Sequence, residues 1–300
     1  MPLITGTENS EALLGTLGDD SIVGLDGDDN ILGGEGDDLE FGNQGKDTLK
    51  GGDGDDTLLS GKDDDYIFGD DGNDVISGDI GADFLEGGDG EDIIFGNKDN
   101  DTIFGGDGND FLFGGEGDDT IYGEIGNDVL SGDKGADVLI GGTGKNIYVI
   151  NTNSGGPSIE EADRIIGFDG DDKIALMGDV DISEINIAFV RPDPNSSMGN
   201  YVFSNLRTGE YVAILENVTE SVLTADSFTD DLTPSDDPDP GPPDPPSSGG
   251  DEDEDDGDDG GTDDGGGTDD GGGTDDGGTD DGGGTDDGGG TDDGGGTDDG

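Results

Sequence analysis

A nine-residue period constrains the fold of this chain more than any other feature. It fills residues 6–149 with sixteen consecutive copies, without insertion or deletion, and residues 51–59 (GGDGDDTLL) are a representative copy. The shared pattern is Gly-Gly-x-Gly-x-Asp-x-U-x, in which U is aliphatic. Self-similarity at a fixed short period is typical of a solenoid, in which stacked copies bury a continuous core. We therefore predict a repeat architecture.

Each copy supplies one turn and one strand. Glycines at the first, second and fourth positions, such as Gly105, Gly106 and Gly108, predict tight turns with positive φ and carbonyl oxygens that point inward. The aliphatic eighth residue belongs to a predicted three-residue strand and points into the solenoid. Two copies close one coil, so each copy stacks on the copy after next. Eight such coils would make a rod on the order of 38 Å long.

The sixth position carries Asp in fourteen of the sixteen copies. Only the outermost copies differ, with Glu11 in the first and Asn146 in the last, as expected where terminal repeats act as caps. The fourteen aspartates are Asp20, Asp29, Asp38, Asp47, Asp56, Asp65, Asp74, Asp83, Asp92, Asp101, Asp110, Asp119, Asp128 and Asp137.

Stacking places each of these aspartates beside the one two copies later. This leaves twelve pairs, from Asp20 with Asp38 to Asp119 with Asp137. A cation held between two such turns would contact two carboxylates together with turn carbonyls. Oxygen ligands in a flexible loop favour Ca²⁺ over Mg²⁺, which demands a stricter octahedron. We predict about twelve Ca²⁺ sites, with the fourteen aspartates as metal ligands.

Composition supports a cation-dependent chain. The formal net charge is −70 and only 26% of the residues are hydrophobic, too few for an ordinary globular core of this length. So acidic a chain repels itself unless cations neutralise it, and its sign disfavours nucleic-acid binding. The absence of Cys and His removes disulfides and the usual zinc sites. No stretch is long enough to span a membrane, and the N-terminus lacks the features of a cleaved secretory signal.

Composition also divides the chain. We expect a lead at 1–5, the repeat roll at 6–149, a β-rich cap at 150–229 and an acidic tail at 230–300. The cap alternates strand-like runs with turn signals, which predicts a small antiparallel unit that covers the open end of the solenoid. The tail is Pro/Asp-rich and then Gly/Thr/Asp-rich, and no aliphatic or aromatic residue follows Leu232. We predict that it is disordered and acts as a solvated spacer.

A few copies depart from the pattern. Ser60 replaces a first-position glycine, and Asp63 and Asp99 replace fourth-position glycines. Asp tolerates a left-handed backbone, so these turns should persist. Glu40 stands where an aliphatic residue should point inward, and a local strand shift that turns Leu39 inward would keep the core apolar.

Aromatic residues at the ninth position form a second pattern. Phe95 and Phe113 should stack on one outer face, and Phe104 and Tyr122 on the other. A cross-strand ladder that supports the sheet is the simpler interpretation. An adhesive surface for a partner is the alternative.

The repeats resemble the RTX family, the hemolysin-type calcium-binding repeats of bacterial proteins exported by type I secretion. This resemblance implies a right-handed parallel β-roll with calcium in the turns on both sides, bound by the sixth-position aspartates and turn carbonyls. It also implies folding on reaching millimolar calcium outside the cell, after export by the type I secretion machinery. Residues 163–168 (DRIIGF) and 171–176 (DDKIAL) resemble the β segment that commonly follows such rolls.

The sequence thus predicts an all-β parallel β-roll with a β cap and an acidic tail, acting as a secreted, non-enzymatic calcium-binding protein that folds on binding Ca²⁺. One alternative is a structural or adhesive component of a cell surface or matrix, with possible self-association. Another is an export module of a toxin or enzyme with its activity in 150–229. Carboxylates there, such as Glu160, Glu161 and Asp163, could do acid/base work, although no spacing distinguishes them.

Overall fold

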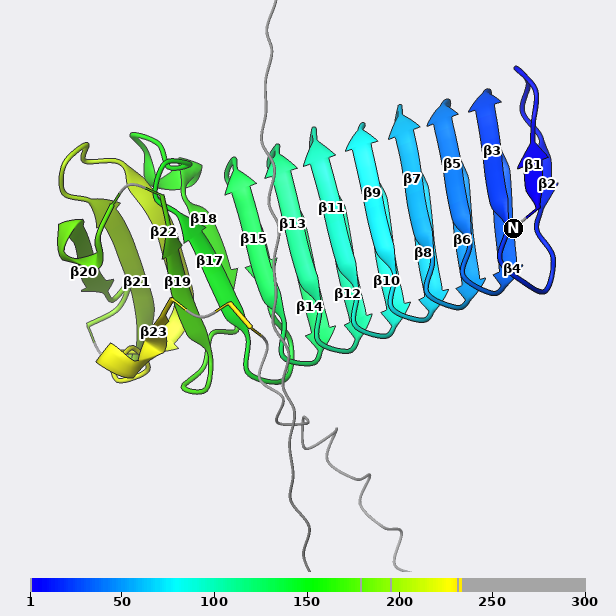
Figure 1. The fold of residues 1–300 in the computed structure, drawn as a ribbon. Coiled ribbons are helices and arrows are strands. Elements are labelled where there is room, and N and C mark those ends of the chain that lie inside the picture. Colours follow the sequence, from blue (N-terminus) through cyan, green and yellow to red (C-terminus); the bar gives the residue numbers. More distant parts are fainter. Residues whose placement is uncertain (1, 179, 195, 231, 234–300) are drawn as a thin grey trace, which may run out of the picture. The chain divides into compact units, whose positions relative to one another are not determined.

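The structure, a computed structural model, describes residues 2–178, 180–194, 196–230 and 232–233. These residues form β-strands and three short 3₁₀ segments (Figure 1). None of the helical segments in this part of the chain has the length and apolar character needed to cross a membrane. The tail predicted to be disordered, 230–300, lies almost entirely outside the described residues.

The copies contribute alternately to two parallel sheets. Sheet A contains β1 (Leu3–Thr5), β3 (Ser21–Asp26), β5 (Leu39–Gln44), β7 (Thr57–Lys62), β9 (Val75–Ile80), β11 (Ile93–Lys98), β13 (Phe111–Glu116), β15 (Val129–Lys134) and β17 (Ile147–Asn151). Sheet B contains β2 (Ala12–Leu14), β4 (Asn30–Glu35), β6 (Thr48–Asp53), β8 (Tyr66–Asp71), β10 (Phe84–Asp89), β12 (Thr102–Asp107), β14 (Thr120–Ile125) and β16 (Val138–Ile140).

The register between neighbouring strands confirms the two-copy coil. In sheet B, Thr48 pairs with Tyr66 and Gly52 with Asp70, an offset of 18 residues that recurs along the roll. The strands are longer than predicted, however. Most span six residues, because pairing continues through the first three positions of the following copy instead of stopping at the ninth. The glycines therefore lie partly in the sheet and not only in the turn.

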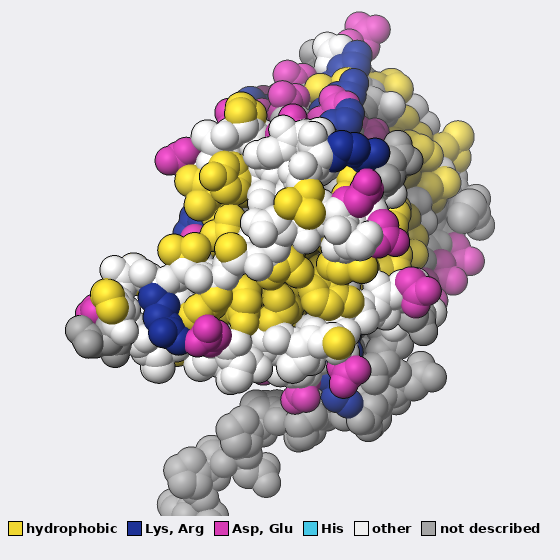
Figure 2. Space-filling model, turned by 90° about the vertical axis from the view of Figure 1, so that its left-hand side faces the viewer, with side chains coloured by type: hydrophobic (Ala, Val, Ile, Leu, Met, Phe, Trp, Pro, Cys, Tyr) yellow, Lys and Arg dark blue, Asp and Glu magenta, His cyan; other side chains and the backbone are white. Residues whose placement is uncertain are grey.

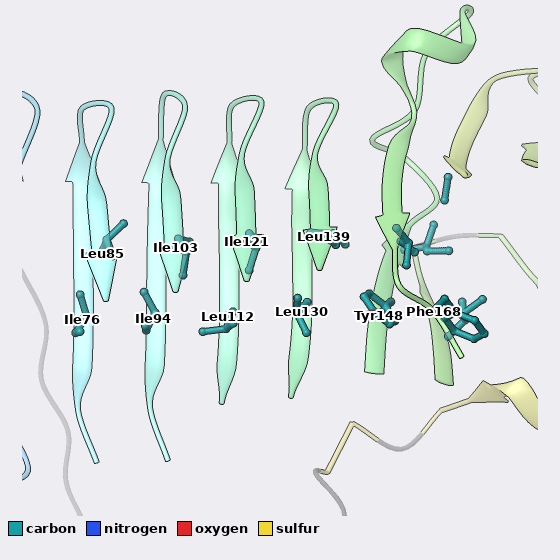
Figure 3. Close-up of a cluster of buried hydrophobic side chains, with 14 of the residues drawn as sticks. Ile76, Leu85, Ile94, Ile103, Leu112, Ile121, Leu130, Leu139, Tyr148 and Phe168 are labelled. Atoms are coloured by element: carbon teal, nitrogen blue, oxygen red, sulfur yellow. The ribbon is translucent and has the colours of Figure 1, made fainter. Parts of the chain in front are cut away.

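The core is one row of eighth-position side chains between the two sheets. Figure 3 shows Ile76, Ile94 and Leu112 from sheet A facing the sheet B side chains across this narrow space. The eighth-position aliphatic residues from Ile22 to Leu139 are fully buried. Burying a Leu or Ile side chain stabilises a fold by about 1.5–3 kcal/mol relative to leaving it exposed. With one such residue per copy, the apolar core is thin.

From the third copy onward, left-handed backbone occurs at two positions of each turn. In the representative copy Gly52 has φ 113° and Gly54 has φ 135°. The substituted fourth-position residues keep this conformation, with φ 76° at Asp63 and 72° at Asp99. The prediction that these turns persist is confirmed, because the short polar side chain of Asp tolerates the conformation.

Glu40 is not turned out of the core. It pairs with Ile22 on one side and Leu58 on the other, in the unshifted register, and its side chain is fully buried. The predicted strand shift that would turn Leu39 inward is therefore wrong. Neighbouring strands hold β5 on both sides, and a one-residue slip would turn every side chain of the strand to the opposite face.

Both sheets continue beyond the last regular copy. Sheet A adds β19 (Lys173–Met177) and β23 (Phe228–Thr229), and sheet B adds β18 (Asp163–Ile166) and β22 (Tyr211–Thr219), all in parallel. Arg164 on β18 donates to both carboxylate oxygens of Glu216 on β22, at 2.7 and 2.9 Å.

Apart from an isolated bridge between Gly156 and Tyr211, antiparallel pairing in the described part of the chain occurs at the outer edge of sheet B. There β20 (Ile185–Val190) pairs with β21 (Met198–Asn205), which pairs with β22. The predicted antiparallel unit is thus correct for these three strands and wrong for the others after residue 150, because those strands extend the solenoid. The short 3₁₀ segments η1 (Ile159–Glu161), η2 (Ile182–Glu184) and η3 (Ala225–Ser227) connect them.

The end of the solenoid that carries these strands is partly apolar. Hydrophobic side chains remain visible over its middle in Figure 2. A cavity of about 400 Å³ there is lined by Ile174, Leu176, Val180 and Phe228 together with polar neighbours.

The predicted aromatic pairs are confirmed. Phe95 and Phe113 stack with ring centroids 5.2 Å apart on sheet A, and Phe104 and Tyr122 stack at 4.6 Å on sheet B. Phe84 extends the second row, since its ring lies 5.4 Å from that of Phe104. Such cross-strand pairs stabilise a sheet.

Truncation of a core residue should cost far more than truncation of its outward neighbour. Ile94 is fully buried whereas the adjacent Ile93 is 37% exposed. We expect Ile94→Ala to lower the free energy of unfolding by about 2–5 kcal/mol. Ile93→Ala should lower it by about 1 kcal/mol or less. Equal losses in chemical denaturation would contradict the one-sided core.

Candidate metal sites in the turns

The sixth-position aspartates line the interior edge of the turns on both sides of the roll. All fourteen are buried, none with more than 3% of its surface exposed. From Asp20 to Asp119, the backbone N–H of each aspartate donates to Oδ1 of the aspartate 18 residues later, as Asp92 does to Asp110 at 2.8 Å. Twelve such bonds, at 2.6–3.0 Å, join the same twelve pairs that the sequence predicts.

Asp163 and Asp172 extend these columns, and the sequence analysis did not assign them there. Asp137 donates its N–H to Oδ1 of Asp163 at 3.2 Å, and Asn146 donates to Oδ1 of Asp172 at 2.9 Å. Both aspartates are buried. The signal was present in the sequence, because Asp163 and Asp172 are nine residues apart and each precedes an isoleucine by two residues. Each of them lies 26 residues after its donor instead of 18, so the nine-residue period is broken and the signal is hard to see.

The second carboxylate oxygen of these aspartates lacks a hydrogen-bond donor. From Asp29 to Asp137, Oδ2 of every sixth-position aspartate is buried without a partner among the described residues. Asp20 differs, because its Oδ2 accepts from the N–H of Thr16 at 2.6 Å and its Oδ1 is the unpartnered atom. A buried carboxylate oxygen without a donor is costly unless the charge is paired or neutralised.

These oxygens face the first-position glycine of their own copy. A Cβ placed on Gly105 would lie 2.3 Å from Oδ2 of Asp110 and 2.8 Å from the carbonyl oxygen of Gly123 in the next coil. The carboxylate and the carbonyl therefore converge beside Gly105, in space that any other residue would occupy. The same convergence recurs along the roll, as at Gly69 and Gly87.

The first-position glycine therefore has a different role from the predicted one. Positive φ occurs at the second and fourth positions, whereas the first position needs glycine for space. Ser60 is the exception: its hydroxyl donates to the carbonyl oxygen of Gly78 at 2.8 Å. It also faces Asp65, where it partly offsets the rise in the pKa of that carboxyl.

Burial shifts the ionisation of these carboxyls strongly. It raises the pKa of Asp56 to about 7 and the pKa values of Asp101 and Asp110 to about 8. The N–H donors on Oδ1 oppose this rise, while neighbouring carboxylates in the columns add to it. At neutral pH the folded roll thus favours neutralisation of these groups, by a proton or by a cation.

The donor set suits a hard cation. Carboxylate and carbonyl oxygens are the ligands that Ca²⁺ prefers, in numbers of six to eight and without strict geometry. No group of three or more His, Cys, Asp or Glu side chains that could hold a metal occurs in the described part of the chain. A cation in these turns would therefore draw most of its ligands from backbone carbonyls, with the sixth-position aspartates supplying the charge.

Fifth-position residues form a second, exposed ladder that the sequence analysis also missed. Asn73 donates its N–H to Oδ1 of Asp55 at 2.9 Å, and Glu91 donates to Oδ1 of Asn73 at 2.8 Å. The direction is opposite to that of the sixth-position ladder, because here the side chain accepts from the later copy. This ladder ties neighbouring turns together at the surface.

Comparison with known proteins agrees with this geometry. A family model of the RTX calcium-binding nonapeptide repeat matches residues 5–40, 41–76, 77–112, 113–148 and 160–182. The last match contains Asp163 and Asp172, which extend the aspartate columns. No curated protein matches the sequence.

Two solved structures are similar to parts of the chain. The AlgE6R3 subunit from the Azotobacter vinelandii mannuronan C5-epimerase is 25% identical, with 51% of this chain and 93% of that chain covered and a TM-score of 0.35. The extracellular lipase LipA from Serratia marcescens is 18% identical, with 61% and 40% covered and a TM-score of 0.26. Both TM-scores are low, so neither similarity bears on function.

The family match spans more than half of the chain and coincides with the stacked turns and buried aspartate columns described above. The chain therefore belongs to the RTX calcium-binding nonapeptide repeat family.

Proposed function

We propose that this chain is a secreted, non-enzymatic calcium-binding protein whose β-roll folds when Ca²⁺ binds between stacked turns. Each cation lies between Oδ2 of a sixth-position aspartate and the first-position carbonyl of the next coil. The fourteen aspartates are the charged ligands, and about twelve ions bind per chain. The observation that carries this proposal is the column of buried Oδ2 atoms without donors, most of which face a carbonyl oxygen beside a glycine.

Electrostatics explains why binding and folding would be coupled. The chain has a formal charge of −70, and folding brings buried carboxylates into columns where they repel one another. Bound Ca²⁺ offsets the cost of burying these carboxylates and the repulsion between them. The unfolded chain has no preformed site, so the binding free energy becomes folding free energy.

An extracellular location fits this coupling. Proteins that require millimolar calcium to fold stay unfolded where calcium is scarce and fold after export. We propose export by type I secretion machinery on the strength of the family alone. Calcium ions are the partners of the roll, and nucleic acid is disfavoured by charge.

A structural or adhesive role at a cell surface or in a matrix is the second candidate. The stacked rings on the outer faces favour it, since Phe95 is 37% exposed and stacks on Phe113. Calcium-dependent self-association, measured by analytical ultracentrifugation, would distinguish this role from that of a free soluble protein.

An enzymatic role for 150–229 has less support. Glu160 and Glu161 are exposed in η1, whereas Asp163 is buried and accepts the N–H of Asp137. Two of the three carboxylates thus face solvent, and the third belongs to an aspartate column.

The direct test is far-UV circular dichroism of the full chain during a Ca²⁺ titration, repeated with Mg²⁺. We expect a cooperative gain of β signal with Ca²⁺ and little change with Mg²⁺, which keeps its water more tightly. A chain that is already folded in chelator at a pH above the raised pKa values of the buried aspartates, or that responds equally to both ions, would overturn the proposal.

Protons should substitute for calcium in acid. Burial raises the folded-state pKa values of Asp47, Asp56, Asp101 and Asp110 to about 6 to 8, above the usual value for Asp. Groups with raised pKa contribute stability that is fully present below the unfolded pKa and lost as pH rises through the folded pKa. The calcium-free chain should therefore show β signal near pH 4 and lose it between about pH 6 and pH 8. In saturating Ca²⁺ this loss should disappear, and a pH profile unchanged by calcium would contradict the assignment.

A single aspartate should account for one ion. Asp110→Asn keeps the Oδ1 acceptor, as Asn146 does for the N–H of Asp128 at 2.9 Å, but removes the negative charge. We expect one Ca²⁺ fewer per chain by native mass spectrometry. At a calcium concentration of about 100 times the Kd, losing that site lowers the free energy of unfolding by about 2.7 kcal/mol. Asp107→Asn removes an exposed carboxylate three residues away and should change neither quantity.

A further inference from the structure

Glu40 is the one carboxylate among the eighth-position residues that form the core. It lies in β5 between Ile22 and Leu58 of the neighbouring strands and is fully buried. Both of its carboxylate oxygens are buried without a hydrogen-bond partner among the described residues. An unpaired ionised carboxylate in an aliphatic row would strongly destabilise the fold.

The carboxylate of Glu40 reaches one of the turn sites from the inside. A Cβ placed on Gly33 would lie 2.3 Å from Oδ2 of Asp38, 2.7 Å from the carbonyl oxygen of Gly51 and 2.8 Å from Oε1 of Glu40. Three oxygens from three different strands or turns thus converge beside Gly33.

The copies whose eighth residue is aliphatic lack this third oxygen. Beside Gly51 the three nearest atoms to a Cβ come from Asp56 and from the carbonyl of Gly69, and none comes from an eighth-position side chain. The eighth-position neighbour there is Leu58, which has no oxygen to offer. The site beside Gly33 is therefore chemically distinct within the roll.

A second polar eighth-position side chain also reaches the space beside a first-position glycine. Tyr148 replaces the aliphatic residue in the last copy, and its hydroxyl accepts the N–H of Gly141 at 2.9 Å. The same hydroxyl lies 2.5 Å from a Cβ placed on Gly141. There the polar atom is satisfied by a hydrogen bond, whereas the oxygens of Glu40 have no such partner.

The surroundings of Glu40 are strongly anionic. Burial, to which the carboxylates of Asp56 and Asp38 add, raises the pKa of Glu40 to about 9. The backbone N–H groups of Gly33 and Lys50 face the carboxylate and offset part of this rise, without forming hydrogen bonds of good geometry. Without a cation, a proton must neutralise the group. A divalent cation would neutralise Glu40 and Asp38 together.

We propose that Oε1 of Glu40 and Oδ2 of Asp38 bind one Ca²⁺ together, with the carbonyl oxygen of Gly51, in a site that extends into the interior of the roll. The inference rests on the proposed calcium function and deepens it. Ligand charge tunes calcium affinity, so a site with a second carboxylate fills before the others. Calcium binding would then order the N-terminal coils first.

The test compares the full wild-type chain with Glu40→Gln, which keeps the shape of the side chain and removes its charge. Native mass spectrometry at limiting Ca²⁺ counts the ions, and circular dichroism gives the calcium midpoint. We expect Glu40→Gln to bind one ion fewer, and the step at lowest calcium to disappear or to move by about 10-fold or more. Glu86→Gln, which removes an exposed carboxylate on β10, is the matched control and should behave as wild type.

A second variant addresses a failure to fold. Glu40→Leu restores the residue type of the other copies. It should fold and bind as many ions as wild type at saturating Ca²⁺, and it should bind one ion fewer at limiting Ca²⁺. The same ion count at limiting Ca²⁺ and the same first step in Glu40→Gln or Glu40→Leu as in wild type would overturn the inference and leave the proposed function intact. A wild-type chain that binds no calcium would instead overturn the proposed function.

Discussion

A buried carboxylate oxygen without a hydrogen-bond donor is the constraint on which the rest of this roll depends. From Asp29 onward, each sixth-position aspartate uses Oδ1 to accept an N–H from the preceding coil, which fixes the 18-residue stacking. The Oδ2 of each of these aspartates is buried and has no hydrogen-bond partner among the described residues. The core offers little to offset this cost, because each copy contributes one inward aliphatic residue. Neutralisation of the columns therefore decides whether the roll is stable, and a hard cation suits the oxygens that surround them.

Much of this arrangement was predictable because the period is strict. A repeat without insertions fixes which residues stack, so the two-copy coil, the inward row and the aspartate pairs follow from the sequence. The extension of the columns to Asp163 and Asp172 was missed, because extra residues before them break the period. The continuation of both sheets past residue 150 was missed for the same reason.

Other features were not predictable because one residue type serves different purposes. Glycine at the second and fourth positions provides positive φ, whereas at the first it leaves room for a carboxylate and a carbonyl, and the sequence does not distinguish the two. The strand length depends on pairing through those glycines. Glu40 points inward because the neighbouring strands hold β5 in register. The stability gained from this pairing outweighs the cost of burying a carboxylate.

The turns are consequently not equivalent along the roll. Ser60 places a hydroxyl where most copies have glycine, Tyr148 fills the corresponding place in the last copy, and Glu40 adds a carboxylate beside Gly33. Binding along the columns should therefore occur in several steps rather than as one set of identical sites. The repeat supplies a scaffold, and these few substitutions make individual turns chemically different from the others.

The most direct test of the central claim is the anomalous diffraction of crystals grown in calcium. The account predicts peaks in a column along each edge of the roll. Each peak should lie roughly 2.3–2.6 Å from Oδ2 of a sixth-position aspartate and from a first-position carbonyl oxygen. Crystals of the folded roll grown in calcium without such peaks, with Oδ2 hydrogen-bonded to water or protonated, would contradict it.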